Sequence, residues 1–276
     1  MEYLENYFHL DTGIKVFYRC YFPKGNEDIV IGVHGIAEHG GRYSHLGEYL
    51  SSNGYGFCIM DLRGHGKTAE YTEKGYVDKF EEFIYDLDSF ISKIIKQTGH
   101  TRVHLLGHSM GGLIAVYYAG YVGKNIKSLI TSGAAVYLPI PIFTKILLTL
   151  VNTISPRSKA KLPINPAELS TDLETAKKYV EDPLVVKNLT LRLLAELYSA
   201  SKRVWKYIEN INVPVLIMHG EKDRVVPVEA SKRLYNALKV EDKQLVIFPE
   251  MKHEILNEKN KKLVLETILK WLNNYK

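Results

Sequence analysis

The chain has 276 residues, of which 46% are hydrophobic and 24% charged, and its formal net charge is +5. This composition excludes an intrinsically disordered protein, and the length allows one large core with a modest insertion. Lys and Arg are interspersed with Asp and Glu, so the basic block that is typical of nucleic-acid-binding proteins is missing. We therefore expect an ordered globular protein with solvated surface charges and no nucleic-acid partner.

Targeting signals and cysteine content favour a cytoplasmic protein. The first twenty residues lack the basic start, the apolar stretch and the cleavage site of a secretory signal. The most apolar segment, residues 138–154, contains two prolines and a lysine and falls short of the roughly 20 residues that span a bilayer. The two cysteines, Cys20 and Cys58, suit a reducing compartment and offer neither a disulfide framework nor a zinc set. We expect both to be small core side chains.

Short apolar runs rich in β-branched residues alternate with helical patterns along the chain. Two early runs, residues 7–10 and 15–22, are joined by Asp-Thr-Gly and predict a hairpin at a sheet edge. Six later runs are typical of strands buried on both faces: 29–33, 57–60, 103–106, 129–131, 215–218 and 245–248. Amphipathic helical spacing lies between them, as in residues 80–94. This order predicts an α/β fold with a mostly parallel, doubly wound sheet.

The alternation stops over residues 135–208, where only helical signals remain. Phe143, Leu147 and Val151 lie on one apolar helical face within this segment. We therefore predict two parts, a core and a helical cap insertion: residues 1–134 with 209–276, and residues 135–208.

The motif Gly-His-Ser-Met-Gly at residues 107–111 follows a predicted strand and precedes a helix-like run. A serine on such a tight turn stands exposed above the sheet, and glycines beside it let strand and helix pass closely. The start of the helix also favours developing negative charge. Ser109 is the predicted nucleophile, and the alternative is an ordinary glycine-rich turn.

A serine hydroxyl needs a base within hydrogen-bond reach, and ten histidines compete for that role. His253 follows the last predicted strand on a short loop, where the carboxyl ends of parallel strands converge. We predict His253 as the base, with a purely structural histidine as the alternative. Four other histidines near strand ends stand beside glycines, and we expect them to shape turns: His34, His65, His108 and His219.

The base in turn needs a carboxylate that orients it, and two aspartates qualify. Asp223 stands in the motif HGEKD, directly after the predicted strand 215–218. Asp61 stands in the motif DLRGHG, where the neighbouring Arg63 suits an ion pair or a turn anchor. We predict Asp223 as the acid and keep Asp61 as its rival.

Five motifs occur along the chain in this order: HGIAEHGGRY, DLRGHG, GHSMG, HGEKD and KHEILNE. Together they resemble the monoacylglycerol lipase and lysophospholipase branch of the α/β-hydrolases, from about residue 29 to the C-terminus. The resemblance implies the α/β-hydrolase fold and a catalytic triad in the order Ser109, Asp223, His253. It also implies an oxyanion hole made by the backbone N–H groups of Ile36 and Met110.

Other positions of these motifs have expected supporting roles. Glu38, His39 and Arg42 match the first motif, and we expect them to hold its loop without reacting. Residues 68–70 read Thr-Ala-Glu where relatives usually have Ser and Gly, which concerns only the local shape of that loop. No metal and no cofactor are expected.

These residues predict ester hydrolysis through an acyl-enzyme, with Ser109 attacking, His253 moving the proton and Asp223 orienting His253. The resemblance favours monoacylglycerols or related single-chain lipid esters as substrates. Two alternatives stay open: a peptidase or carbon-carbon bond hydrolase on the same scaffold, and a ligand-binding relative without catalysis.

The cap insertion is expected to lie over the triad and to determine substrate choice. Phe143, Leu147 and Val151 are the predicted pocket residues. The same stripe suits a transient contact with a membrane surface, or packing of the helix on the body. We therefore expect a cytoplasmic enzyme with at most peripheral membrane contact.

Overall fold

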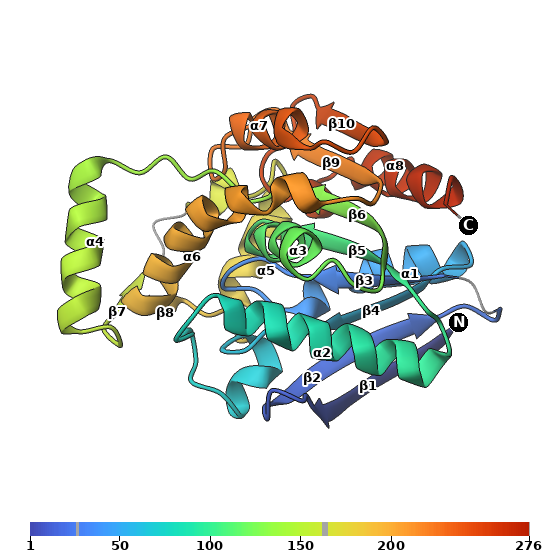
Figure 1. Cartoon of the computed structure of the whole chain (residues 1–276), viewed down its shortest axis with the longest axis horizontal. Coiled ribbons are helices and arrows are strands. Elements are labelled where there is room, and N and C mark those ends of the chain that lie inside the picture. Colours follow the sequence, from blue (N-terminus) through green and yellow to red (C-terminus); the bar gives the residue numbers. More distant parts are fainter. Residues whose placement is uncertain (26–27, 162–164, 276) are drawn as a thin grey trace.

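A computed structural model of the chain describes residues 1–25, 28–161 and 165–275, without the side chains of residues 145–147 and 149. A central eight-stranded sheet has the strand order β1-β2-β4-β3-β5-β6-β9-β10 (Figure 1). Its strands are β1 (Glu2–His9), β2 (Lys15–Phe22), β3 (Ile29–Val33), β4 (Gly56–Met60), β5 (Val103–His108), β6 (Ile126–Ser132), β9 (Val215–Gly220) and β10 (Lys243–Phe248).

The sheet is parallel from β4 to β10 and antiparallel at one edge. β1 pairs antiparallel with β2, and β2 pairs antiparallel with β4. The five remaining neighbouring pairs are parallel. β3, β4, β5 and β9 are buried along their full length, which explains their continuous apolar sequences. The predicted α/β fold with a mostly parallel sheet and an N-terminal hairpin is confirmed.

Helices cover both faces of the sheet and create a core on each side. One core includes side chains of α2 (Glu81–Thr98), α3 (Met110–Tyr121) and α7 (Glu229–Ala237). The other core includes side chains of α1 (Ser44–Ser52) and α8 (Lys261–Asn273). In Figure 1, α2 and α3 lie in front of the sheet and α1 and α8 behind it. Because β4, β3, β5, β6, β9 and β10 are parallel, the loops that follow them lie together at the carboxyl ends of the strands.

The chain between β6 and β9 carries the segment that we call the cap, residues 135–208. Its elements are α4 (Ile142–Ile154), β7 (Lys159–Lys161), α5 (Leu173–Glu181), β8 (Asn188–Thr190) and α6 (Leu191–Arg203). β7 and β8 form a small antiparallel sheet, so the prediction of helices alone is wrong at this point. Strands of three residues are too short for their apolar alternation to be recognised in a sequence.

α4 stands apart from the central sheet, at the left of Figure 1, and packs against α6. Four of its apolar side chains are between 56% and 83% exposed: Ile142, Phe143, Leu150 and Ile154. In the described part of the chain, no helix has the length and apolar character that crossing a bilayer requires.

Cys20 and Cys58 lie directly opposite each other on β2 and β4 and form a disulfide. Both are fully buried, as predicted, but the expectation that they remain unpaired is wrong. The two residues are 38 positions apart in sequence, and the antiparallel pairing of β2 with β4 brings their Cα atoms to 4.1 Å. Two cysteines alone give no information about this pairing.

Replacing both cysteines with alanine should lower the free energy of unfolding by about 2–4 kcal/mol, because the crosslink restricts the unfolded chain. Denaturant titrations with and without reductant measure the effect. The double variant should show no response to reductant. A wild-type transition that is equally insensitive to reductant would contradict a stabilising disulfide.

Candidate active site

Ser109 stands at the turn between β5 and α3 with φ 53° and ψ −118°. A non-glycine residue rarely adopts a positive φ, so the surrounding structure must hold it there. A Cβ on Gly107 would stand 2.3 Å from the carbonyl oxygen of Gly111, and a Cβ on Gly111 would stand 2.1 Å from that of Val33. The glycines are thus required by the close approach of strand and helix.

The structure brings Ser109, His253 and Asp223 together from three separate loops. Nε2 of His253 lies 2.9 Å from Oγ of Ser109, and Nδ1 lies 2.6 Å from Oδ2 of Asp223. Nδ1 donates to the carboxylate, so Nε2 of the neutral ring is left to accept the hydroxyl proton. All three side chains are buried. This geometry allows the hydroxyl of Ser109 to be deprotonated as it attacks an electrophile.

Charge supports this arrangement. Burial by itself raises the pKa of Asp223, but His253 and His219 outweigh burial and hold that pKa well below its usual range. The backbone N–H groups of Val225 and Val226 also donate to this carboxylate, at 2.8 and 2.9 Å from Oδ1. Burial lowers the pKa of His253, yet the Asp223 carboxylate raises it above its ordinary value. Asp223 therefore stays ionised, and His253 is a ready proton acceptor.

The rival acid and a neighbouring histidine take other places. Asp61 accepts hydrogen bonds from the backbone N–H groups of Gly40 and Lys67, both at 2.8 Å, and so anchors two turns.

The ring of His108 lies 4.8 Å from that of His253, and burial lowers the pKa of His108 to about 3. His108 is therefore neutral and leaves His253 as the ring that carries charge.

The loop after β3 reaches a cavity that opens beside Ser109. Ile36 and Met110 line this cavity beside Ser109, at the two positions predicted to supply oxyanion donors. Oε1 of Glu38 accepts a hydrogen bond from the backbone N–H of Gly35 at 2.6 Å, which holds the loop from within. The role of the two N–H groups stays a prediction.

Arg42 joins this loop to the loop of His253. Nε of Arg42 lies 3.1 Å from Oε2 of Glu38, and Nη2 donates to Glu254, the neighbour of His253. Burial raises the pKa of Glu254 to about 7, and the charge of Arg42 opposes that rise. The guanidinium also lies 4.7 Å from the ring centre of Tyr179 in α5. Arg42 therefore contacts both loops of the site and the cap.

Two further contacts tie the loop after β3 to the cap. Nε2 of His39 lies 2.8 Å from Oδ2 of Asp182, which follows α5. The backbone N–H of Val186 donates to the carbonyl of Ala37 at 2.7 Å. Like Arg42, His39 thus makes contacts that hold the loop.

Replacing Arg42 with methionine should destabilise the fold by about 3–5 kcal/mol, because two buried carboxylates lose their counter-charge. The folded state holds the proton of Glu254 more tightly than the unfolded chain, so the contribution of Glu254 to stability falls as pH rises from about 4.5 to about 7. Without Arg42 this fall should be larger, and the loss of stability should be greater at alkaline than at mildly acidic pH. Denaturant titrations of wild type and variant, at mildly acidic and at alkaline pH, measure this loss of stability.

Arg63 offers a matched control, since it pairs with Glu82 and Asp86 of α2 at 2.7 and 2.6 Å. Arg63→Met should also destabilise the fold but leave turnover per folded molecule unchanged. Arg42→Met should lower that turnover. Equal turnover in the two variants would show that Arg42 only supports folding.

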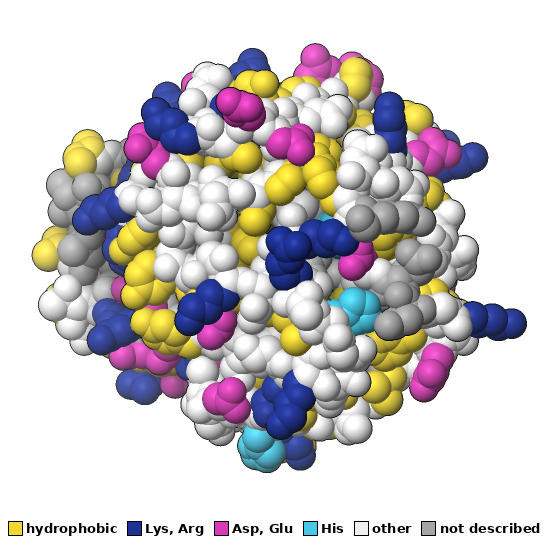
Figure 2. Space-filling view, turned by 45° about the vertical axis from the view of Figure 1, so that its right-hand side comes forward, with side chains coloured by type: hydrophobic (Ala, Val, Ile, Leu, Met, Phe, Trp, Pro, Cys, Tyr) yellow, Lys and Arg dark blue, Asp and Glu magenta, His cyan; other side chains and the backbone are white. Residues whose placement is uncertain are grey.

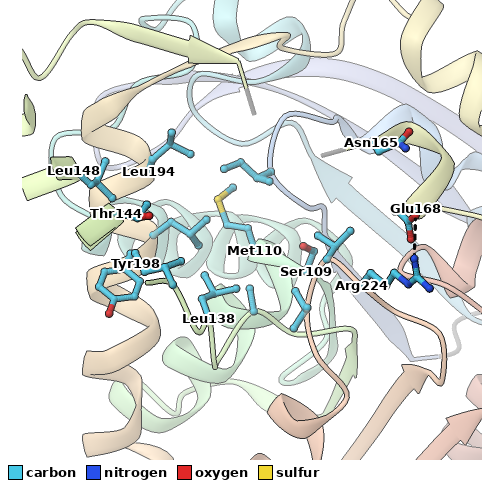
Figure 3. A pocket seen from close by; sticks show the side chains of 16 residues that line it. Ser109, Met110, Leu138, Thr144, Leu148, Asn165, Glu168, Leu194, Tyr198 and Arg224 are labelled. Atoms are coloured by element: carbon cyan, nitrogen blue, oxygen red, sulfur yellow. Dashed lines mark ion pairs between the residues drawn. The ribbon is translucent and has the colours of Figure 1, made fainter. Parts of the chain in front are cut away.

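Ser109 opens into a cavity of about 400 Å³. Figure 3 shows Leu148 and Leu194 at one end of it and Glu168 and Arg224 at the other, with Ser109 between them. The cap and the adjoining loops supply most of the lining: Ala135, Leu138, Ile140, Thr144, Leu148, Asn165, Glu168, Leu194, Leu197 and Tyr198. The loop that follows Asp223 also lines the cavity, through Arg224, Val225 and Val226. The cavity therefore has an apolar and a polar end.

The predicted pocket residues on α4 need correction. Thr144 and Leu148 line the cavity, whereas Phe143 is 73% exposed and Val151 is not among the lining residues. The side chain of Leu147 lies outside the described residues. A helical pattern shows which side chains share a face but not which face turns inward. Here the side chain of Phe143 turns toward solvent.

Residues 24–260 match the family model described as serine aminopeptidase, S33. The chain belongs to this family. It resembles the monoacylglycerol lipase of Mycolicibacterium smegmatis, with 28% identity over 267 residues that cover 94% of this chain and 93% of that protein.

Two solved structures of similar proteins superpose closely on this member of the family. The crystal structure of Paleococcus ferrophilus monoacylglycerol lipase has 30% identity and a TM-score of 0.84, and the match covers 95% of this chain and 99% of that one. A soluble variant of Saccharomyces cerevisiae monoglyceride lipase, in complex with a substrate analog, has 27% identity and a TM-score of 0.86, with 98% and 95% covered. The predicted membership of the monoacylglycerol lipase and lysophospholipase branch of the α/β-hydrolases is confirmed.

Proposed function

We propose that this carboxylic ester hydrolase cleaves monoacylglycerols or related single-chain lipid esters through an acyl-enzyme on Ser109. His253 takes the hydroxyl proton as Ser109 attacks the ester carbonyl, and Asp223 stabilises the imidazolium that forms. His253 then gives the proton to the leaving alcohol, and a water molecule releases the fatty acid by the same proton route. The hydrogen-bonded chain from Asp223 to Ser109, at the wall of a largely apolar cavity, carries this proposal.

The oxyanion of the tetrahedral intermediate would lie between the backbone N–H groups of Ile36 and Met110. Met110 is the first residue of α3, so its N–H belongs to the unpaired donors at a helix start, where negative charge is favoured. Donors of this kind contribute roughly 10²–10³ in turnover each.

The two ends of the cavity suit the two halves of a single-chain ester. The more apolar end, at Leu148 and Leu194, would hold the acyl chain, because burying hydrocarbon against leucine side chains is favourable. The polar end, where Glu168 lies 3.8 Å from Arg224, would hold a hydroxylated alcohol such as glycerol. A cavity of this size and polarity matches a monoacylglycerol better than a triacylglycerol.

A series of p-nitrophenyl esters from acetate to palmitate, followed by monoacylglycerols, tests the substrate class. Leu148→Asn should lower kcat/KM for long-chain esters roughly tenfold to a hundredfold and leave acetate nearly unchanged, because it removes buried apolar contact. Leu150→Asn is the matched control, since Leu150 lies on the same helix and is 56% exposed. An equal loss on acetate and palmitate would argue against an acyl site at Leu148.

The same assay separates the alternatives. A peptidase should cleave aminoacyl p-nitroanilides in preference to esters, and a carbon-carbon bond hydrolase should cleave neither series well. A ligand-binding relative without catalysis would leave all of these substrates intact.

We further propose that the cap makes transient contact with an anionic membrane surface. Residues 135–208 contain 11 Lys and Arg against six Asp and Glu, so the whole formal excess of five positive charges lies in the cap. On the face that Figure 2 presents, which is turned away from α4, basic and acidic side chains are interspersed. The exposed apolar side chains of α4 would enter the headgroup region.

Vesicle sedimentation tests this contact. The protein should bind vesicles that contain phosphatidylglycerol more than vesicles of phosphatidylcholine, and added salt should weaken binding. Phe143→Ser combined with Ile154→Ser should reduce binding, whereas Leu173→Ser on α5, a residue with 76% exposure, should not. No preference for anionic vesicles would contradict the proposal.

A further inference from the structure

His219, the penultimate residue of β9, makes three polar contacts that leave its ring no freedom to turn. Nδ1 lies 2.7 Å from the hydroxyl oxygen of Ser231 in α7. Nε2 lies 2.9 Å from the carbonyl oxygen of Val226 and 3.0 Å from Oδ2 of Asp223. The ring is fully buried, and the imidazole therefore sits behind the carboxylate that orients His253.

These contacts determine which nitrogen of His219 carries the proton. A carbonyl oxygen and a carboxylate oxygen only accept hydrogen bonds, so Nε2, which faces both, must be protonated. Nδ1 of the neutral ring then accepts the hydroxyl proton of Ser231. The two acceptors at Nε2 thus fix the tautomer, and the hydroxyl of Ser231, which can donate or accept, adapts to it.

We infer that His219 is a positioning residue for the proposed reaction: its Nε2–H faces Oδ2 of Asp223 and its contact with Val226 holds the loop that carries this carboxylate. The inference rests on the proposed function. Oδ2 is the same oxygen that accepts from Nδ1 of His253. His219 therefore competes with His253 for the charge on Oδ2 and sets how strongly Asp223 holds the proton of His253.

Shaping the turn after β9 does not explain His219. A Cβ on Gly220 would stand 2.1 Å from the carbonyl oxygen of Lys252, so the close approach of the two loops depends on that glycine. The expectation that His219 serves the turn is thus incomplete, because its ring contacts the carboxylate of the site.

His104 provides a matched control at the opposite end of the sheet. It is also fully buried on a strand, its Nδ1 lies 2.7 Å from the hydroxyl oxygen of Ser128, and its Nε2 lies 3.6 Å from Oδ2 of Asp28. Since His104 is the second residue of β5 and Ser109 follows the end of that strand, it does not contact the site. Replacing His104 therefore removes an equally buried histidine and leaves the surroundings of Asp223 unchanged.

The test compares His219→Leu, His219→Gln and His104→Leu. His219→Leu should lower kcat roughly tenfold to a hundredfold, by analogy with loss of the hydrogen-bond partner of a metal ligand. It should also move the acid limb of kcat/KM upward by roughly half a pH unit, because Oδ2 then holds the proton of His253 more tightly. His219→Gln should restore both values toward wild type, since its amide N–H₂ stands near the place of Nε2. His104→Leu should change only stability.

A second readout does not depend on turnover. In the Ser109→Ala background, NMR titration of the His253 ring should give a higher pKa with His219→Leu than without it. The other ionisable groups near His253, which are His108, Glu38 and Glu254, are unchanged in all of these variants. An unshifted titration together with an unshifted acid limb would overturn the inference. If no ester is hydrolysed by wild type but the titration shifts, the positioning role stands and the proposed function fails.

Discussion

Ser109→Ala should lower ester turnover by roughly a million-fold, leaving only the residual effect of binding and of the oxyanion donors. Oγ is the one atom at the turn between β5 and α3 that can form the acyl-enzyme, and it lies 2.9 Å from the base. Progress curves with a p-nitrophenyl ester measure the loss. Covalent labelling by a fluorophosphonate should disappear in parallel.

Ser109→Gly separates loss of chemistry from loss of fold. Glycine adopts the positive φ of this position without strain, so the variant should be about 1 kcal/mol more stable than wild type and equally inactive. Hydrolysis that survives in both variants would show that the nucleophile lies elsewhere.

Asp223→Asn should lower turnover by about 10⁴, because an amide next to Nδ1 supports the wrong tautomer of His253. The carboxylate of Asp223 raises the pKa of His253, so its removal should also move the acid limb of the pH profile downward. The pH dependence of kcat/KM for one activated ester reports both effects.

Asp61→Asn is the control for this variant, since Asp61 was the rival acid in the sequence. Its carboxylate accepts from the backbone N–H groups of Gly40 and Lys67, so the variant should lose stability and keep its turnover. The reverse result, with Asp61→Asn inactive and Asp223→Asn active, would exchange the two roles.

The sequence alone predicted the sheet and the three residues that the structure brings together. Strands buried on both faces have continuous apolar sequences, and turns where two backbone segments approach closely contain glycines. Both features can therefore be recognised in the sequence. Ser109 and Asp223 each follow such a strand. His253 follows β10, an edge strand that is only partly buried, although its apolar sequence predicts burial on both faces. The loops after these three strands are expected to meet, because the strands run parallel.

The sequence did not show which strands are neighbours in the sheet or which face of α4 turns inward. The disulfide depends on β2 lying next to β4, and neither Cys20 nor Cys58 carries a signal for that neighbour. The inward face of α4 depends on how the helix docks against α6, so Leu148 lines the cavity where Phe143 was expected.

His219 shows the same limit within the site. Its place beside a glycine indicated a turn, and only the fold of the loop after β9 brings its ring to 3.0 Å from Asp223. The sequence by itself determined the class of fold and the branch of the α/β-hydrolases, because local patterns encode burial and tight turns and the five motifs carry the resemblance. The tertiary structure decided the pocket, the disulfide and the partner of the acid, because each depends on contacts between segments that are free to dock in more than one way.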